Sequence, residues 1–358
     1  MKKSILKVHL DSPDIFKKQH FELWKKTKKY YSHFVSFDFQ FKKILDQDFL
    51  VLKKYYIQSA TLWRGDQLIL AMHLYQFSSE KMRFGAIACI PDLTQEESEF
   101  FWSELLNQLK NTTLVGPING HLYLGFSFLP KDIKEQNVGI STSAFHPGLA
   151  NLFSNPRLSI YRRYFSFETD LTSVKKILKN DTDKPFMTFR SFSKLFCKRD
   201  FNWMNEIVNK SFVHHFDFEA LSHQENWDIL KGSWLFLAPQ YFRFLIYKNQ
   251  PIGFCFALKD FNFIFSHNNS DLKNIFYGLL KSRSLKRARL IHIGLIPEFQ
   301  GQGLASMLRW PIMNQMQKKG IESLESSYID EGNQNSIGNV QSTEGKKLHE
   351  FFLYKISQ

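Results

Sequence analysis

The sequence predicts an α/β protein of two tandem domains, each with a mixed, largely antiparallel sheet flanked by helices. Three observations support this fold class. At 358 residues the chain exceeds a typical single domain. Its hydrophobic fraction of 43% suffices for two cores, and its 37 phenylalanines suit interiors where helices pack on sheets. The expected order of strands and helices also runs in a similar way through each half.

The first half is expected to begin with a strand and a helix and to continue with an antiparallel hairpin. Apolar patterning predicts strands at residues 5–10, 59–63, 68–75, 82–90, 114–115 and 158–169. The turn Arg64-Gly65-Asp66 joins the second and third of these strands. Helical periodicity covers 12–32 and a later segment that opens with Asp92 or Thr94 as its N-cap.

The second half repeats this order after a polar boundary near residues 170–182. Strands are predicted at 186–192, 241–247, 252–258, 289–296, 321–329 and 348–356. Helices are predicted at 200–212, 219–230, 270–282 and 304–319. We therefore expect domains at 1–172 and 183–358, with each half closed by its own last strand.

Composition limits the partners and the compartment. The balance of 47 Lys+Arg against 34 Asp+Glu gives a net charge of +13, which would attract polyanions. No nucleic-acid-binding motif accompanies this charge, so nucleic acid is not an expected partner. No apolar run has the length of a membrane span or the form of a signal peptide, so we expect a cytoplasmic protein. The three cysteines are too far apart for a metal or disulfide motif, and the oligomeric state is left open.

The most informative segment is a tight loop between a predicted strand and a predicted helix. It reads Gln300-Gly301-Gln302-Gly303-Leu304-Ala305. Glycines let the backbone approach a ligand, and the first amides of a helix lack acceptors, so a pyrophosphate fits there. Neither G-x-G-x-x-G nor Gly-Lys-Ser/Thr occurs at this loop, which excludes Rossmann and P-loop sites. A plain strand-to-helix turn is the alternative.

The loop and its flanks resemble one enzyme family. IPEFQGQGLASML resembles the cofactor motif of the GNAT N-acyltransferases, and the resemblance extends over about 186–355. NQPIGFCFALKDFN resembles the family's hairpin, and ESSYIDEGNQNS its fifth strand and the Asn-bearing segment after it. The whole chain is similar to tandem GNAT-like bacterial proteins related to YghO. In the first half IPDLTQEESEFF places carboxylates where phosphates would bind, so we interpret that half as a degenerate GNAT-like domain.

The resemblance implies acetyl-CoA, or another acyl-CoA, as cofactor and an amine-bearing small molecule or peptide as acceptor. The backbone of Leu295 and Ile296 would pair with the pantetheine arm, and the fourth and fifth strands would diverge to admit the thioester. Asn333, or else Asn335, would contact the cofactor near its pantetheine end. The pyrophosphate would be held by the loop residues Gln300, Gly301, Gln302, Gly303, Leu304 and Ala305.

Direct attack by an amine on a thioester needs a proton acceptor and a donor to the leaving thiolate. His292 is the first candidate base, since it lies on the strand beside the expected groove. Glu325 is a second candidate, and Tyr328 is a candidate acid. Each also has a structural interpretation as a packed or solvated residue. Pro311 departs from the family pattern and is expected to kink the helix that follows the loop.

The run SFVHHFDFEALSHQE invites two further interpretations. His214-His215 is not expected to bind metal, because adjacent residues do not share a face and HExxH is absent. The resemblance places the run beside the acceptor, so His215, Phe216 or Phe218 would contact it. Two rival functions stay open: a non-enzymatic binding protein on a lapsed GNAT fold, and an aminoacyl-tRNA-dependent transferase of the Fem type. Coenzyme A affinity without turnover would indicate the first, and salt-sensitive RNA binding the second.

Overall fold

The computed structural model describes residues 5–27, 38–126, 129–130, 147–174, 186–213, 215, 217–261, 264 and 270–357. The chain divides into two compact units. Unit 1 comprises residues 1–163, 265–274 and 351–358, and unit 2 comprises residues 164–264 and 275–350. Most of the predicted linker, residues 175–185, lies outside the described part of the chain.

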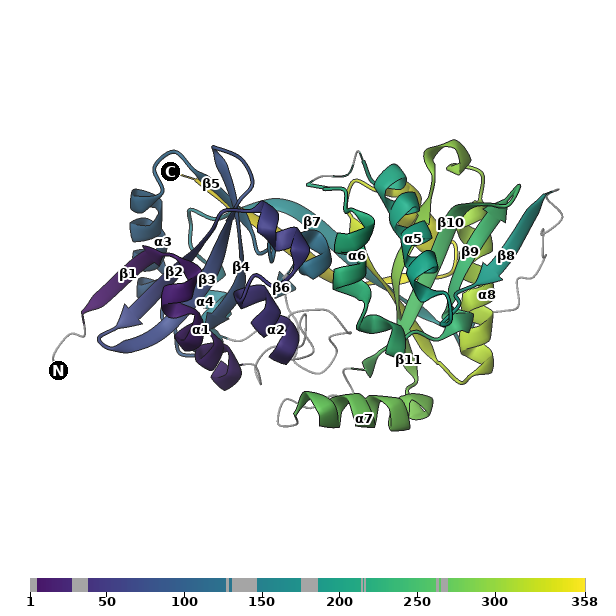
Figure 1. Cartoon of the computed structure of the whole chain (residues 1–358), viewed down its shortest axis with the longest axis horizontal. Coiled ribbons are helices and arrows are strands. Elements are labelled where there is room, and N and C mark those ends of the chain that lie inside the picture. Colours follow the sequence, from purple (N-terminus) through teal and green to yellow (C-terminus); the bar gives the residue numbers. More distant parts are fainter. Residues whose placement is uncertain are drawn as a thin grey trace. The chain divides into compact units, whose positions relative to one another are not determined.

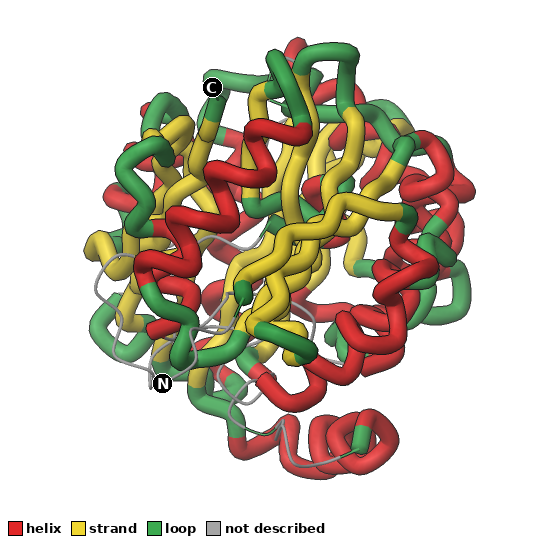
Figure 2. The backbone as a smooth tube through the Cα atoms, turned by 90° about the vertical axis from the view of Figure 1, so that its left-hand side faces the viewer, coloured by secondary structure: helices red, strands yellow, loops and turns green. Residues whose placement is uncertain are grey.

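Unit 1 has a mixed sheet in the order β1-β2-β3-β4-β5 (Figure 1). Its strands are β1 (Leu6–Asp11), β2 (Ile57–Arg64), β3 (Gln67–Gln76), β4 (Lys81–Cys89) and β5 (Thr113–Gly116). Its helices are α1 (Pro13–Thr27), α2 (Asp38–Leu45), α3 (Gln95–Gln108) and α4 (Pro147–Phe153). β2 and β3 form the predicted hairpin, whereas β4 and β5 run parallel. In Figure 2 the helices lie on both sides of the strands.

Unit 2 repeats this plan. Its strands are β8 (Met187–Ser191), β9 (Phe242–Tyr247), β10 (Gln250–Lys259), β11 (Arg287–Leu295) and β12 (Ser323–Asp330). Its helices are α5 (Cys197–Ser211), α6 (His223–Leu230), α8 (Leu304–Lys318) and α9 (Gln334–Gln341). Helix α7 (Asp271–Lys281) follows β10 and is divided between the units, with residues 271–274 in unit 1 and 275–281 in unit 2. The pairs β8–β9, β9–β10 and β10–β11 are antiparallel, whereas β11 and β12 are parallel.

Two strands do not close the halves in which the sequence predicts them. β7 (Ser159–Asp170) was expected to complete the first domain, but its residues 164–170 pair with β12 of unit 2. β13 (Lys346–Ile356) was expected to complete the second, but Tyr354 and Ile356 pair with β5 of unit 1. β6 (Leu129–Pro130) also pairs with β13. Local patterning predicts an extended strand correctly, but it does not specify which sheet edge supplies the hydrogen bonds.

Helices cover both faces of the unit 2 sheet. A Cβ on Gly253 would touch Leu308 of α8, and a Cβ on Gly294 would come near Ile207 of α5. Gly253 and Gly294 occupy successive register positions of the β10–β11 pair, so α8 and α5 lie on opposite faces. The core on the α8 side is closely packed, and α8 continues through Pro311 as a single helix.

Candidate functional site

The two parallel strands of unit 2 separate halfway along their length. β11 and β12 pair from Arg287 with Ser323 to Leu290 with Ser326. Beyond that point β11 continues to Leu295 and β12 to Asp330, and no further pair joins them among the described residues. The divergence expected from the sequence is therefore present, and it leaves the second half of β11 with one edge that β12 does not cover.

The hydrogen bonds at the end of β11 define which residues face that edge. The Ile296 N–H donates to the Ile252 carbonyl oxygen on β10 over 3.0 Å. Because successive residues of a strand point their backbone groups to opposite sides, those of Ile293 and Leu295 face the gap. Of the predicted pair, the Leu295 amide thus faces the open edge, whereas the Leu295 carbonyl is bound by Gln300 and Ser211 and the Ile296 amide is engaged with β10.

The glycine loop follows directly after this edge. Gly301 and Gly303 have φ values of +73° and +75°, in the left-handed region that favours glycine. A Cβ at either position would meet no heavy atom within 4 Å, so open space lies over the backbone. Gly303 is the N-cap of α8, and the amides of Leu304 and Ala305 have no acceptor within the helix.

The glutamines of the loop stabilise it from within. The Gln300 side chain donates from Nε2 to the Leu295 carbonyl oxygen over 2.8 Å. Gln302 donates from Nε2 to the Glu298 carbonyl oxygen over 3.1 Å. The sequence suggested that these side chains donate to a phosphate. In the structure the two side chains hold the loop in place. The groups left facing open space over Gly301 and Gly303 are backbone amides.

Asn333 begins α9 on the other side of the gap. Its Oδ1 accepts a hydrogen bond of 3.0 Å from the Ser336 amide, so it is the N-cap of that helix. Asn339 on α9 donates from Nδ2 to the Ser306 hydroxyl at the start of α8 over 2.9 Å. The buried Arg309 guanidinium adds hydrogen bonds to the Asn339 carbonyl and to Thr343. The first half of α8 is therefore tied to the end of α9.

Glu325 lies in a buried ion pair. Arg287 donates from Nη2 to Glu325 Oε2 over 2.9 Å, and the Ser327 hydroxyl donates to Oε1 over 3.2 Å. Glu325 has no solvent exposure. This arrangement corresponds to the structural interpretation that the sequence left open for it.

Tyr328 contacts a second buried arginine. The Arg289 guanidinium lies 4.7 Å from the centre of the Tyr328 ring. Burial raises the pKa of the Tyr328 hydroxyl to about 12, with Arg289 acting in the opposite direction. Tyr328 therefore keeps its proton at neutral pH and is able to donate it.

His292 lies on the α5 side of β11 in aromatic surroundings. Its ring centre is 5.0 Å from Phe212 and 5.2 Å from Phe254, both edge to face. Burial, together with the neighbouring His215, lowers the pKa of His292 to about 4. The imidazole is consequently neutral at physiological pH.

His215 connects this cluster to the end of β12. Its ring centre is 4.6 Å from that of Phe212, which contacts both histidines. Burial lowers the pKa of His215, while the Asp330 carboxylate raises it. The structure thus groups His292, His215 and Asp330 where β11 and β12 diverge. The sequence indicated His215 only as an acceptor contact, and it gave no signal for Asp330. His214 and Phe216 lie outside the described residues.

The corresponding gap of unit 1 is filled by its own chain. β4 and β5 pair only as far as Arg83 with Val115. The Ile118 amide then donates to the Phe84 carbonyl oxygen, and the Ala86 amide donates to Asn119 Oδ1, each over 2.6 Å. A Cβ on Gly85 would clash with the Ile118 carbonyl. The segment GPINGHLYLGF, residues 116–126, therefore covers the open edge of β4 and acts as a plug.

The helix start in unit 1 is also occupied. Thr94 caps α3 in a capping box with Glu97, and Arg64 donates from Nε to the Glu97 carboxylate over 2.7 Å. Both carboxylate oxygens of Glu97 thus have partners at the place where unit 2 has glycines. The interpretation of unit 1 as a domain without a cofactor loop stays a prediction.

Within the described residues, no three or more His, Cys, Asp or Glu side chains are grouped as a metal site would require. None of the described helices is long and apolar enough to cross a bilayer.

Comparisons with known proteins relate this architecture to a family. Residues 203–341 match the model of the acetyltransferase (GNAT) family. No curated protein sequence matches the chain.

Among solved structures, a tandem GNAT protein from the clavulanic acid biosynthesis pathway aligns with a TM-score of 0.56 at 10% identity, covering 98% of each chain. A probable N-acyltransferase from Enterococcus faecalis V583 aligns with a TM-score of 0.54 at 9% identity, covering 98% of this chain and 72% of its own. The fold class of two tandem GNAT-like domains is therefore confirmed, while a relation to YghO stays a prediction.

Proposed function

We propose that this protein is an acyl-CoA-dependent N-acyltransferase with one working site, in unit 2. The observation that carries the proposal is the contrast between the two gaps. The edge of β11 is open beside a glycine loop, whereas the edge of β4 is plugged by Ile118 and Asn119. The GNAT family match over 203–341 supports the reaction class.

The residues present fit a coenzyme A thioester. The amides of Gly301, Gly303, Leu304 and Ala305 would hold its pyrophosphate, since the space over both glycines is open. Gln300 and Gln302 would support the loop through their bonds to Leu295 and Glu298. The Ile293 backbone and the Leu295 amide would pair with the pantetheine amides as an added strand would, while the Leu295 carbonyl stays bound to Gln300 and Ser211.

Asn333, as the cap of α9, would border the same gap from the other side. Acetyl-CoA, or another acyl-CoA, supplies the activated acyl group when bound. Attack by a free amine then requires that the protein accept one proton and return one to the thiolate.

His292, His215 and Asp330 are proposed to accept the amine proton. His292 is neutral and lies on the α5 side of β11 beside the gap, and the proton would come to rest on His215, where the Asp330 carboxylate would stabilise the imidazolium. Tyr328, protonated and in contact with Arg289, would donate to the sulfur. Glu325 is assigned to the support of Arg287 and not to proton transfer.

The acceptor is proposed to be an amine on a small molecule or a peptide. The test is thiol release from acetyl-CoA in the presence of a panel of such amines, with each N-acyl product identified by mass spectrometry. Amine-dependent thiol release is the expected result. Tight coenzyme A binding without turnover on any amine would overturn the enzymatic proposal and leave a binding protein.

A further inference from the structure

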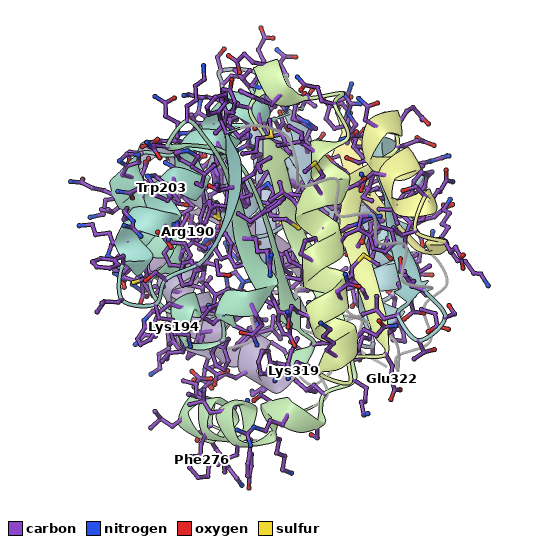
Figure 3. All side chains as sticks on the ribbon, turned by 90° about the vertical axis from the view of Figure 1, so that its right-hand side faces the viewer. Arg190, Lys194, Trp203, Phe276, Lys319 and Glu322 are labelled. Atoms are coloured by element: carbon purple, nitrogen blue, oxygen red, sulfur yellow. The ribbon has the colours of Figure 1, made fainter. Side chains whose placement is uncertain are left out.

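Helix α7 exposes its apolar side chains to solvent. Leu272, Phe276, Leu279 and Leu280 are 80%, 58%, 50% and 61% exposed. Their spacing places them in one stripe along the helix. In Figure 3 the Phe276 side chain projects away from the ribbon. Scattered exposed apolar residues are ordinary, but four large ones aligned on one short helix indicate an interaction surface.

The inner side of the same helix is small and polar. Asn274 is 4% exposed, and Gly278 is buried. The Asp271 carboxylate accepts hydrogen bonds from the Asp38 and Phe39 amides over 3.0 and 3.1 Å. A helix that only covered a protein core would direct its leucines inward, so the orientation of α7 is the reverse of the usual one.

Apart from Asp271 at its start, the charged side chains of this helix are all basic. Lys273, Lys281 and Arg283 are exposed on α7 and the turn after it. From residue 271 to residue 286 the only acid is Asp271, which is occupied by the two amides. Two copies packed face to face would bring these cations together, whereas anionic headgroups would match them. Leucine and phenylalanine between lysines is the pattern of helices that lie in a membrane interface.

We propose that the outer face of α7, formed by Leu272, Phe276, Leu279 and Leu280, docks on an anionic lipid surface. The helix lies in the plane of the interface, with its apolar stripe inserted and its lysines at the headgroups. Docking of this kind is peripheral, in keeping with the lack of a spanning helix among the described residues. The proposal is independent of the acyltransferase function.

The test uses the full chain in flotation with vesicles of phosphatidylcholine alone and with phosphatidylglycerol added. Wild type should float with the anionic vesicles and lose binding as salt is raised. Phe276→Ser combined with Leu280→Ser should weaken binding roughly tenfold or more. Leu195→Ser is the matched control, since Leu195 is also an exposed leucine, at 84%, on another part of the surface.

Charge is tested by Lys281→Glu with Arg283→Glu, which should also weaken binding to anionic vesicles. Both pairs replace exposed residues, and circular dichroism melts identical to wild type would show that folding is retained. Failure of wild type to bind anionic vesicles would overturn the proposal, as would equal binding by the Phe276→Ser, Leu280→Ser variant. A dimer in sedimentation equilibrium that this variant abolishes would reassign the face to self-association and equally overturn it.

Discussion

The carbonyl oxygen of Leu295 accepts hydrogen bonds from both Gln300 Nε2, at 2.8 Å, and Ser211 Oγ, at 2.6 Å. The end of β11, the glycine loop and the end of α5 therefore meet at one atom. This contact therefore positions the open edge of β11 relative to the proposed phosphate site in the loop. It also fixes both relative to the end of α5.

Gln300→Ala should weaken coenzyme A binding, because it frees the loop from Leu295. The expected loss in binding is about tenfold, with about 1 kcal/mol lost from the free energy of unfolding. Gln317→Ala is the control, since Gln317 donates from Nε2 to the Leu171 carbonyl at the far end of α8. It should lose similar stability and keep full affinity in calorimetry. Equal affinity losses in both variants would contradict a specific role for Gln300.

Asp330→Asn should alter the pH dependence of acyl transfer. Asp330 raises the pKa of His215, so removal of its charge lowers that pKa. The acid limb of kcat/KM should then move to lower pH, and the maximal rate should fall by roughly tenfold or more because the base is weaker. The comparison is Glu331→Gln, which removes a charge from the adjacent exposed residue. An unchanged pH profile in Asp330→Asn would exclude the proposed proton path.

Glu325→Gln should destabilise unit 2 by roughly 1.5–3 kcal/mol, because it removes the closest of the three carboxylates around the largely buried Arg287. Glu322→Gln breaks the exposed pair with Lys286, in which both side chains are more than half exposed. It should cost less than about 1 kcal/mol. Denaturant unfolding measures both variants. If Glu325→Gln abolished turnover while stability stayed intact, Glu325 would have to be reconsidered as a catalytic base.

Buried histidines should make the protein sensitive to acid. Burial lowers the pKa of His20 from 6.5 to about 4, and burial together with His20 lowers that of His73. The unfolded chain binds protons at these sites below pH 6.5 while the folded chain does not, so stability falls as the pH decreases from about 6.5 to 4. His20 alone accounts for roughly 3 kcal/mol of this loss.

The His73→Phe variant tests this dependence. Both ring nitrogens of His73 are buried and have no hydrogen-bond partner among the described residues, so the substitution should not destabilise the protein at neutral pH. It should also flatten the decline in stability toward pH 4. The exposed His9→Gln serves as the control. The measurement is the free energy of unfolding by denaturant at a series of pH values. A steeper fall of this free energy toward pH 4 in His73→Phe than in wild type would contradict the proposed role of the buried histidines.

Much of the fold follows from local patterns in the sequence. The β2–β3 hairpin and the strand–loop–helix around Gly303 were predicted from residue spacing, and the structure confirms them. Of the two N-cap candidates, Asp92 and Thr94, the structure selects Thr94. The pairing of β7 with β12 and of β13 with β5 was not predicted. Alternation of apolar and polar residues indicates an extended strand, but it does not specify the strand with which it pairs. The function of GPINGH as a plug depends on Asn119 reaching Ala86, a contact between distant residues.

The same limit applies to the candidate site. The glycine loop is contiguous, so its residues could be identified together. His215, His292 and Asp330 lie far apart in the sequence and meet only because β11 and β12 diverge beside the end of α5. The engagement of Ile296 with β10 depends on strand register, which a single sequence does not specify.

The most direct test of one working site is calorimetric titration of acetyl-CoA into wild type, Gly303→Glu and Gly65→Glu. Both glycines have positive φ, +75° and +61°, with open space over them, so the two substitutions impose similar strain. Wild type and Gly65→Glu should bind one acetyl-CoA per chain with the same affinity, and Gly303→Glu should not bind. Two sites per chain, or full binding by Gly303→Glu, would contradict the assignment of the cofactor to the loop of unit 2.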